Sequence, residues 1–234
     1  MSKGTNVREV NLAETSLREV NVLLRQPGDG DGDAAFRVLN PKGTHALACG
    51  LDAAVHVEIE GNVGYYCAGM NKEATVVVEG SVGPGVAENM MSGHVHVRGD
   101  ASQAAGATAH GGLLVIDGNA AARCGISLKG ADIVVKGDVG HMSCFMAQAG
   151  TLVVCGDAGE ALGDSLYETR IYVRGDVKSL GADCIEKEMR PEHHDELRRL
   201  LEKAECDGIE ASEFRRYGSA RQLYNFNIDN VDAY

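Results

Sequence analysis

Hydrophobic residues recur along the middle of the chain with a constant period of 19 residues. Two columns of this repeat, four and two positions before a glycine, contain only aliphatic residues, whereas the residue directly before the glycine is charged in six of seven repeats. The first column is Val57, Val76, Val95, Leu114, Ile133, Leu152 and Ile171, and the second is Ile59, Val78, Val97, Ile116, Val135, Val154 and Val173. Because successive side chains of a strand point to opposite faces, this pattern predicts one short β-strand in each repeat.

Each predicted strand ends at a glycine of the same phase. These turn glycines are Gly61, Gly80, Gly99, Gly118, Gly137, Gly156 and Gly175, and no insertion or deletion separates them. Asn, Asp or Ser follows every one, and a small apolar residue comes next. We interpret the pair as a sharp bend, since glycine tolerates φ > 0 and the short polar side chain supplies local hydrogen bonds.

The repeat predicts an all-β fold. Short strands cannot each bury an apolar face alone, but strands stacked about 4.8 Å apart share one core. We therefore expect a parallel β-helix, a solenoid of about seven 19-residue coils. The period does not fit six-residue phasing of left-handed helices, and the handedness rule for parallel strands favours a right-handed coil. The alternative is an antiparallel sandwich, which rarely keeps a constant period.

The segments on either side of the repeats are predicted to cap the open ends of the stack. We divide the chain into residues 1–54, a cap helix with an irregular first coil, residues 55–188, the β-helix, and residues 189–234, a helix with an aromatic tail. The tail contains Phe214, Tyr217, Tyr224, Phe226 and Tyr234, and it either drapes over the coil or docks on another chain.

Both caps carry a helix signal. The run Ser16-Leu17-Arg18-Glu19 is a capping box, and it predicts a short helix that ends at about Arg25. Residues 191–206 place Leu197, Leu200 and Leu201 at helical spacing after a proline, which predicts an amphipathic helix.

One outward column of the strands is apolar where water would be expected. After Glu58 it runs Val77, His96, Val115, Val134, Val153 and Tyr172. An apolar ladder on an outer face needs a cover, which either the chain's own tail or another chain can supply. Our hypothesis is a subunit interface with a partner chain.

Composition restricts the partners and the compartment. The formal net charge is -12, from 22 Lys and Arg against 34 Asp and Glu, so the chain lacks the basic surface that nucleic acids and anionic membranes require. No apolar run approaches the length of about 20 residues that spans a bilayer, and the N-terminus lacks a secretory apolar stretch. Seven cysteines, an odd number, then favour reduced thiols, and we expect a cytoplasmic protein.

A search for ligand sites yields weak candidates. Asp29, Asp31 and Asp33 resemble the start of a calcium loop, but its sixth and twelfth positions are occupied by Ala34 and Asn40, so we favour an acidic loop.

Two groups of metal-binding or redox residue types have ordinary explanations. His94 and His96 share a strand face at a spacing that suits a metal, yet no third ligand follows from the repeat, and solvent-facing or interface histidines are favoured. Cys67, Cys124 and Cys144 fall in or next to one column, and we interpret them as small thiols stacked inside the coil.

Enzymatic motifs are missing from the sequence. It contains no phosphate-binding loop, serine nucleophile elbow, HExxH or CxxC pattern. Asp132, Lys136, Arg170 and Arg174 are outward charges of the kind that polysaccharide-cleaving β-helices gather in a groove, but such charges usually form a solvated face. We predict no catalytic, cofactor-binding or metal-binding residues on this chain, with a stand-alone carbohydrate-active β-helix as the alternative of another class.

The glycine pattern resembles a known family. Gly61-x-x-Gly64, Gly80-x-x-Gly83-x-Gly85, Gly137-x-x-Gly140 and Gly156-x-x-Gly159-x-x-x-Gly163 are similar to the GXGXG domain, the right-handed β-helix that is found in the glutamate synthase large subunit and as one of the subunits of formylmethanofuran dehydrogenase. The flanks are similar too, notably Ser16 to Asn21, and Gly43-x-His45-x-Leu47-x-x-Gly50-Leu51. Three coils depart from the pattern, with Ser102, Ala121 and Lys178 at the second glycine.

Within that family, the ending RRYGSARQLYNFNIDNVDAY looks most like the β-helix subunit of N-methylglutamate synthase. The resemblance implies a non-catalytic subunit that packs between an amidotransferase-like subunit and a glutamate-synthase-like subunit. It also implies that FMN and an iron-sulfur cluster are bound by the latter partner. Met1 is not followed by the cysteine that an amidotransferase needs, and no cysteine spacing typical of a cluster is present. Glutamate synthase and formylmethanofuran dehydrogenase remain the alternatives within the family.

Overall fold

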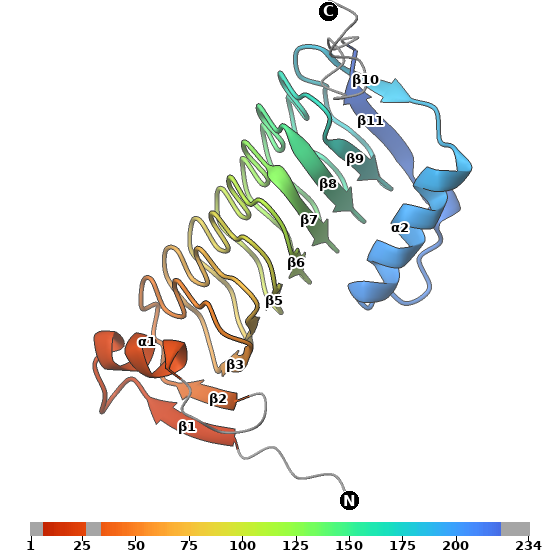
Figure 1. The fold of residues 1–234 in the computed structure, drawn as a ribbon. Coiled ribbons are helices and arrows are strands. Elements are labelled where there is room, and N and C mark those ends of the chain that lie inside the picture. Colours follow the sequence, from red (N-terminus) through yellow and green to blue (C-terminus); the bar gives the residue numbers. More distant parts are fainter. Residues whose placement is uncertain (1–6, 27–33, 221–234) are drawn as a thin grey trace, which may run out of the picture.

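The computed structural model describes residues 7–26 and 34–220, which form one elongated stack of coils with a helix at each end (Figure 1). The calcium-like Asp29, Asp31 and Asp33, and the aromatic Tyr224, Phe226 and Tyr234, lie outside the described residues. In chain order the elements are β1 (Val7–Asn11), α1 (Leu17–Arg25), β2 (Ala34–Leu39), β3 (Val55–Ile59), β4 (Thr75–Val78), β5 (His94–Val97), β6 (Leu113–Ile116), β7 (Lys129–Val135), β8 (Ala149–Val154), β9 (Arg170–Val173), β10 (Cys184–Lys187), α2 (Pro191–Lys203), the 3-10 helix η1 (Ala211–Glu213) and β11 (Arg215–Ser219).

The strands form one sheet in the order β1 to β9, followed by β11 and β10. All pairs from β1 to β9 are parallel, and from β3 onward the register follows the sequence repeat, as in Val76 opposite Val95 and Val95 opposite Leu114. A second row of parallel bridges runs through the residues two positions after the turn glycines, from Val63 to Val177. This pairing confirms the β-solenoid of about seven coils and excludes the antiparallel sandwich.

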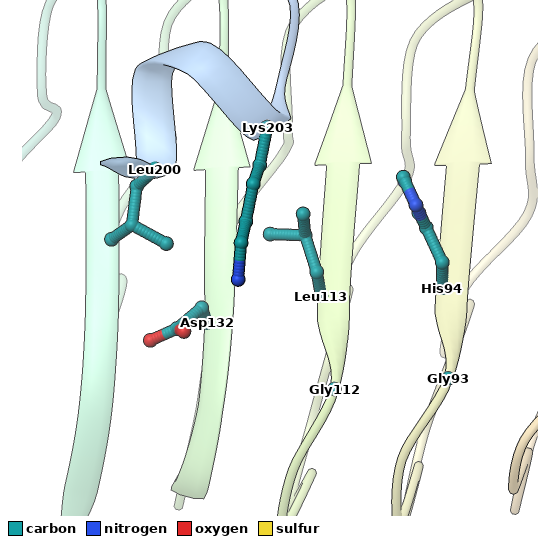
Figure 2. Close-up of a pocket in the computed structure, with 7 residues that line it drawn as sticks. All are labelled: Gly93, His94, Gly112, Leu113, Asp132, Leu200 and Lys203. Carbon is teal, nitrogen blue, oxygen red and sulfur yellow. The ribbon is translucent and has the colours of Figure 1, made fainter. Parts of the chain in front are cut away.

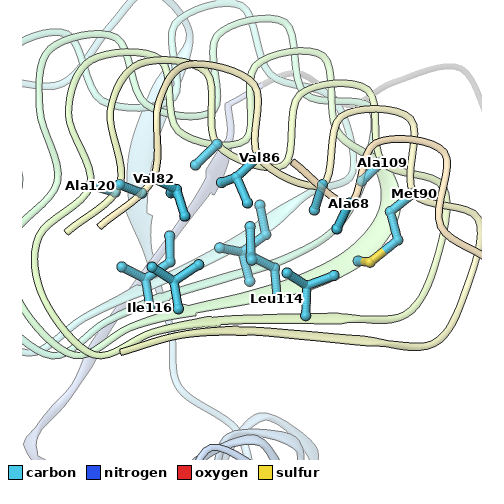
Figure 3. Packing of buried hydrophobic residues seen from close by; sticks show 14 of the residues in the cluster. Ala68, Val82, Val86, Met90, Ala109, Leu114, Ile116 and Ala120 are labelled. Atoms are coloured by element: carbon cyan, nitrogen blue, oxygen red, sulfur yellow. The ribbon is translucent and has the colours of Figure 1, made fainter. Parts of the chain in front are cut away.

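The two aliphatic columns fill the inside of the coil. Every residue of both columns is fully buried, and Figure 3 shows Leu114 and Ile116 facing small side chains such as Val82 and Ala120 from the opposite wall. Cys67, Cys124 and Cys144 are also fully buried and unpaired, which confirms their interpretation as core thiols. Burial raises the pKa of Cys67 and of Cys124 to about 12, so neither is a nucleophile near neutral pH.

The turn glycines are required for close approach between coils. Only Gly61 among the seven has a positive φ, so the explanation from φ > 0 is wrong for the other six. At Gly99 a Cβ would lie 2.6 Å from Ser81 Oγ and 2.8 Å from the carbonyl carbon of Gly80, both in the preceding coil. The space that a side chain needs is therefore already filled by the neighbouring bend.

The polar residue after each of the first six glycines bonds to the next coil, and not locally as the sequence suggested. Asn119 Oδ1 accepts a hydrogen bond of 2.8 Å from the backbone N–H of Asp138, and Asp138 Oδ1 accepts one of 2.7 Å from that of Asp157. The same contact recurs from Asn62 to Asp176 through all seven bends. This ladder explains why Asn, Asp or Ser occupies the column from Asn62 to Asp157.

The outer turns adopt a conformation for which the sequence gives no signal. In the segment 65–70, Tyr66, Ala68 and Met70 have φ of 58°, 52° and 56°, which is left-handed and unfavourable for residues other than glycine. Their N–H groups point alternately up and down the stack: those of Tyr66 and Met70 donate to the following coil, and that of Ala68 donates to Leu47 in the preceding coil. The strained backbone is thus offset by hydrogen bonds between coils.

Both ends of the stack are capped. The α1 capping box forms as predicted, because Ser16 Oγ accepts from the N–H of Glu19 while the Glu19 carboxylate accepts from the N–H of Ser16. Buried Val20 and Leu24 of α1 close the first coil. At the other end, β11 pairs antiparallel with β9 and β10, which stops the parallel ladder.

Candidate subunit interface and its covering helix

Helix α2 lies across the outward face of the last strands (Figure 1). It begins at Pro191, as the sequence predicts, and its leucines pack on the apolar column. The second buried cluster of the protein combines Val115, Val134, Val153 and Tyr172 from the strands with Leu197, Leu200, Leu201, Ala204, Cys206, Ala211 and Phe214 from the C-terminal segment. The chain itself therefore supplies the cover over this part of the face, which is the alternative that the sequence left open.

The predicted interface residues divide into two groups. Val115, Val134, Val153 and Tyr172 are fully buried beneath α2 and are not accessible to a partner while the helix is docked. His96 is buried at the edge of this cover, whereas Val77 on β4 is only half-buried. The part of the outward face that another chain can reach is thus the β3 to β4 end.

Ion pairs fix the helix to the sheet. Arg170 donates to Glu196 through two bonds of 2.7 and 2.8 Å, and the hydroxyl of Tyr172 donates to the same carboxylate at 2.6 Å. Burial opposes ionisation of Glu196, but these hydrogen bonds outweigh it and hold its pKa below the usual value. Further along, Arg174 pairs with Glu213 at 2.9 Å. Arg170 and Arg174, two candidates for a polysaccharide groove, therefore hold the C-terminal segment in place.

A charged network borders the C-terminal end of α2. Asp117 Oδ1 lies 2.8 Å from both His96 Nε2 and Lys136 Nζ, and Asp117 Oδ2 lies 3.3 Å from Arg98. Burial raises the pKa of Asp117, but the hydrogen bonds from Lys136 and His96 outweigh it and lower the pKa overall. The oxygens of this carboxylate are bound by protein donors, so the network is a structural ion-pair cluster.

Of the two positions that the sequence favoured for the histidines, the solvent-facing one is wrong for His96, and the interface one stays a prediction. His96 is only 5% exposed, and the ring of His94 stacks near it with centroids 6.0 Å apart. Burial lowers the pKa of His94, and its Nε2 is buried without a hydrogen-bond partner. Within residues 7–26 and 34–220, no three His, Cys, Asp or Glu side chains gather closely enough to hold a metal ion.

A hollow of about 460 Å³ opens where the last turn of α2 meets β5, β6 and β7. Gly93, His94, Gly112, Leu113, Asp132, Leu200 and Lys203 line it, and Figure 2 shows the Lys203 side chain extending toward Asp132. Burial raises the pKa of Asp132. The hollow brings together one acid, one imidazole and one ammonium group, but it contains no nucleophile oriented by a base.

Exposed apolar side chains mark the outer turns near the N-terminal end. Tyr65, Tyr66 and Met70 are each about half exposed, at 50%, 50% and 53%, and the ring of His45 stacks on Tyr65 at 4.4 Å. Tyrosine and methionine are enriched at protein interfaces. Sequence reasoning missed this surface because it followed the strands, whereas these residues lie in a turn.

Fold and surface together define a β-solenoid whose outward strand face is covered in part by its own helix, and whose outer turn 65–70 carries exposed side chains typical of protein contacts. In the described part of the chain, neither helix has the length and apolar character needed to cross a membrane. No family model matches the sequence. Protein GlxC of Rhizobium meliloti (strain 1021) is 65% identical over 225 residues, which cover 96% of this chain and 99% of that protein. The chain belongs to the same family as Protein GlxC.

Proposed function

We propose that this chain is a non-catalytic β-helix subunit of a glutamate-synthase-like complex in the cytoplasm. Within that class we propose N-methylglutamate synthase, which forms N-methylglutamate and ammonia from methylamine and glutamate. The chain would pack between an amidotransferase-like subunit and a subunit that binds FMN and an iron-sulfur cluster.

The observation that carries the proposal is the incomplete cover of the outward face. Helix α2 packs over the column from Val115 to Tyr172 and leaves Val77 half-buried at the other end of the same column. The exposed Tyr65, Tyr66 and Met70 lie in the turn of the coil that contains Val77. A rigid stack with apolar side chains on two sides of one coil suits a subunit held between two others. The glycine pattern and membership of the GlxC family agree with the glutamate-synthase-like class.

Copurification tests the proposal. A tagged full-length chain isolated from its own cells should bring down larger chains that carry FMN absorbance and iron. The isolated assembly should convert methylamine and glutamate to N-methylglutamate with release of ammonia. An assembly that forms glutamate from glutamine and 2-oxoglutarate instead would support the glutamate-synthase-like class, but it would identify the complex as glutamate synthase and not as N-methylglutamate synthase. A chain that purifies alone, without flavin or iron, and that acts on a substrate by itself would contradict the class.

The variant Val77→Asp tests the location of the contact. A buried carboxylate without a partner opposes association, so the yield of larger chains should fall at least tenfold. Val22→Asp is the matched control, since Val22 is a partly exposed valine on α1 and lies outside the outward column of the strands. Equal recovery from both variants would exclude the β3 to β4 end of the face as an interface.

A further inference from the structure

Two cysteines from distant parts of the chain meet at the C-terminal end of α2. Cys155 directly follows β8 in the outward column that is otherwise charged, and Cys206 lies three residues beyond the last residue of α2. Both are members of the buried cluster beneath the helix, with 5% and 8% of their surface exposed. The two side chains lie close enough for each to shift the pKa of the other, and no disulfide joins them. The S–H of Cys206 donates to the carbonyl oxygen of Ala204 at 3.9 Å.

Two cations flank the thiol pair. Lys136 and Arg174 occupy the same outward column as Cys155, one coil before and one coil after it. Lys136 Nζ also lies 3.3 Å from the carbonyl oxygen of Glu205, the residue directly before Cys206. Both cations also pair with carboxylates, Lys136 with Asp117 and Arg174 with Glu213. The charge of Lys136 still favours a thiolate at Cys206, against the opposing charges of Asp117 and Asp207.

The two sulfurs differ in acidity. The hydrogen bond from Cys155 and the charge of Lys136 lower the pKa of Cys206, whereas that hydrogen bond and burial raise the pKa of Cys155. Cys206 is therefore the thiol that ionises first, with the S–H of Cys155 donating to it. Cys67 also has a neighbouring thiol in Cys49, and Cys124 has one in Cys144, but burial raises the pKa of Cys67 and of Cys124.

We propose that Cys155 and Cys206 are a reversible redox pair whose disulfide locks α2 onto the apolar face. The oxidant is a small hydroperoxide. The Cys206 thiolate attacks one peroxide oxygen, the O–O bond breaks, and a sulfenic acid forms as the other oxygen leaves as hydroxide and takes up a proton. The Cys155 sulfur then attacks the sulfenic sulfur and loses its proton, the S–O bond breaks, and water leaves as the S–S bond forms. The two thiols lose two electrons, which reduce the peroxide, and a dithiol reductant reverses the change.

The consequence of this bond follows from its position. It ties the chain just after α2 to the end of β8, so the helix can no longer lift from Val115, Val134 and Val153. In the reduced state the same helix is held by packing, ion pairs and the hydrogen bond from Tyr172 to Glu196, with no covalent bond to the sheet beneath it. The pair therefore controls whether the apolar column is able to become exposed, independently of the identity of any partner.

Peptide mapping of the oxidised full-length chain tests the proposal. After treatment with hydrogen peroxide at a few equivalents and blocking of free thiols, trypsin should release peptide 137–170 linked to peptide 204–215. Five thiols should remain alkylatable out of the seven cysteines. Because peptide 137–170 also contains Cys144, the variant Cys144→Ala serves as the matched control and should give the same linked pair.

A second readout tests the lock itself. Cleavage at Arg198 and Arg199 within α2 should be about tenfold slower after oxidation and should return to the original rate with dithiothreitol. In Cys206→Ser and in Cys155→Ser, peroxide should leave that rate unchanged. Retention of all seven thiols, a disulfide to another cysteine, sulfinic acid at Cys206 without a linked peptide, or equal cleavage rates before and after oxidation would each overturn the proposal. If either serine variant does not fold, peptide mapping and cleavage of the unmodified chain still decide the outcome.

Discussion

Replacement of one turn glycine by alanine measures how tightly the coils are stacked. At Gly99 the new Cβ would lie 2.6 Å from Ser81 Oγ and 2.8 and 2.9 Å from the carbonyl carbon and oxygen of Gly80. The serine side chain is able to rotate, but the backbone of Gly80 is held in the ladder, so the two coils must separate. Overpacking of this kind costs about 1–3 kcal/mol.

Two further contributions follow from the structure. Separation of the coils weakens the 3.2 Å hydrogen bond from the N–H of Asp100 to Ser81 Oγ, at a cost of about 1 kcal/mol. Alanine also restricts the unfolded chain, which offsets about 0.4–1 kcal/mol. Gly99→Ala should therefore lower the free energy of unfolding by about 1–3 kcal/mol in urea titrations followed by far-ultraviolet circular dichroism.

Gly218→Ala is the matched control for this substitution. Its φ is not positive, and its Cβ would meet only Lys187 Cγ at 3.6 Å and Cε at 3.8 Å, which are ordinary contacts. We expect its stability to be unchanged or slightly raised. Free energies of unfolding within about 0.5 kcal/mol for the two variants would refute the steric reasoning. Recovery of full stability in the double variant Ser81→Ala with Gly99→Ala would show that the side chain is the obstacle, and not the backbone.

Three other outcomes follow from the contacts described above. Asn119→Ala should lower the free energy of unfolding by about 1 kcal/mol, measured by thermal unfolding, because the N–H of Asp138 loses its hydrogen-bond acceptor. Asn119→Asp keeps an acceptor oxygen and should leave the stability unchanged. Because the pKa of Glu196 is lowered in the folded chain, its contribution is present above the unfolded value of 4.5 and is lost as pH falls through the lower folded value. Cleavage of α2 by an acid-stable protease should consequently accelerate below about pH 4.5 in the unmodified chain. The rate should vary less with pH in Glu196→Gln, because residue 196 no longer titrates next to Arg170. Parallel pH profiles of the two chains would contradict this. Leu197→Ala should cost about 2–5 kcal/mol and expose the apolar column, detected as increased binding of a hydrophobic dye, and unchanged dye binding would show that the helix stays docked.

The parts of the fold that repeat along the chain were predictable from sequence. In a stacked solenoid each residue lies over the residue 19 positions away, so Val76, Val95 and Leu114 share one environment, and their common chemistry reveals it. The same logic identified the glycine and Asx columns, although it assigned the glycines to positive φ. Close approach between coils is a property of two stacked bends, and the sequence of one bend does not contain it.

The sequence alone could not predict that α2 covers the apolar column, because the helix and the strands are not related by the 19-residue repeat. The sequence indicated an amphipathic helix from Pro191 and a mostly apolar stripe from Val77 to Tyr172, but each needed a partner and nothing fixed their pairing. Ion pairs between the last coil and the C-terminal segment show how the two pack together. Arg170 meets Glu196 on the second turn of α2, and Arg174 meets Glu213 beyond the helix, so two ion pairs hold the C-terminal segment at two points of its path across the sheet. A partner that displaced α2 would have to replace the ion pair of Arg170 with Glu196 as well as the apolar contacts. For this reason the uncovered end of the face, around Val77, is the part of the column that another chain can bind without first opening the protein.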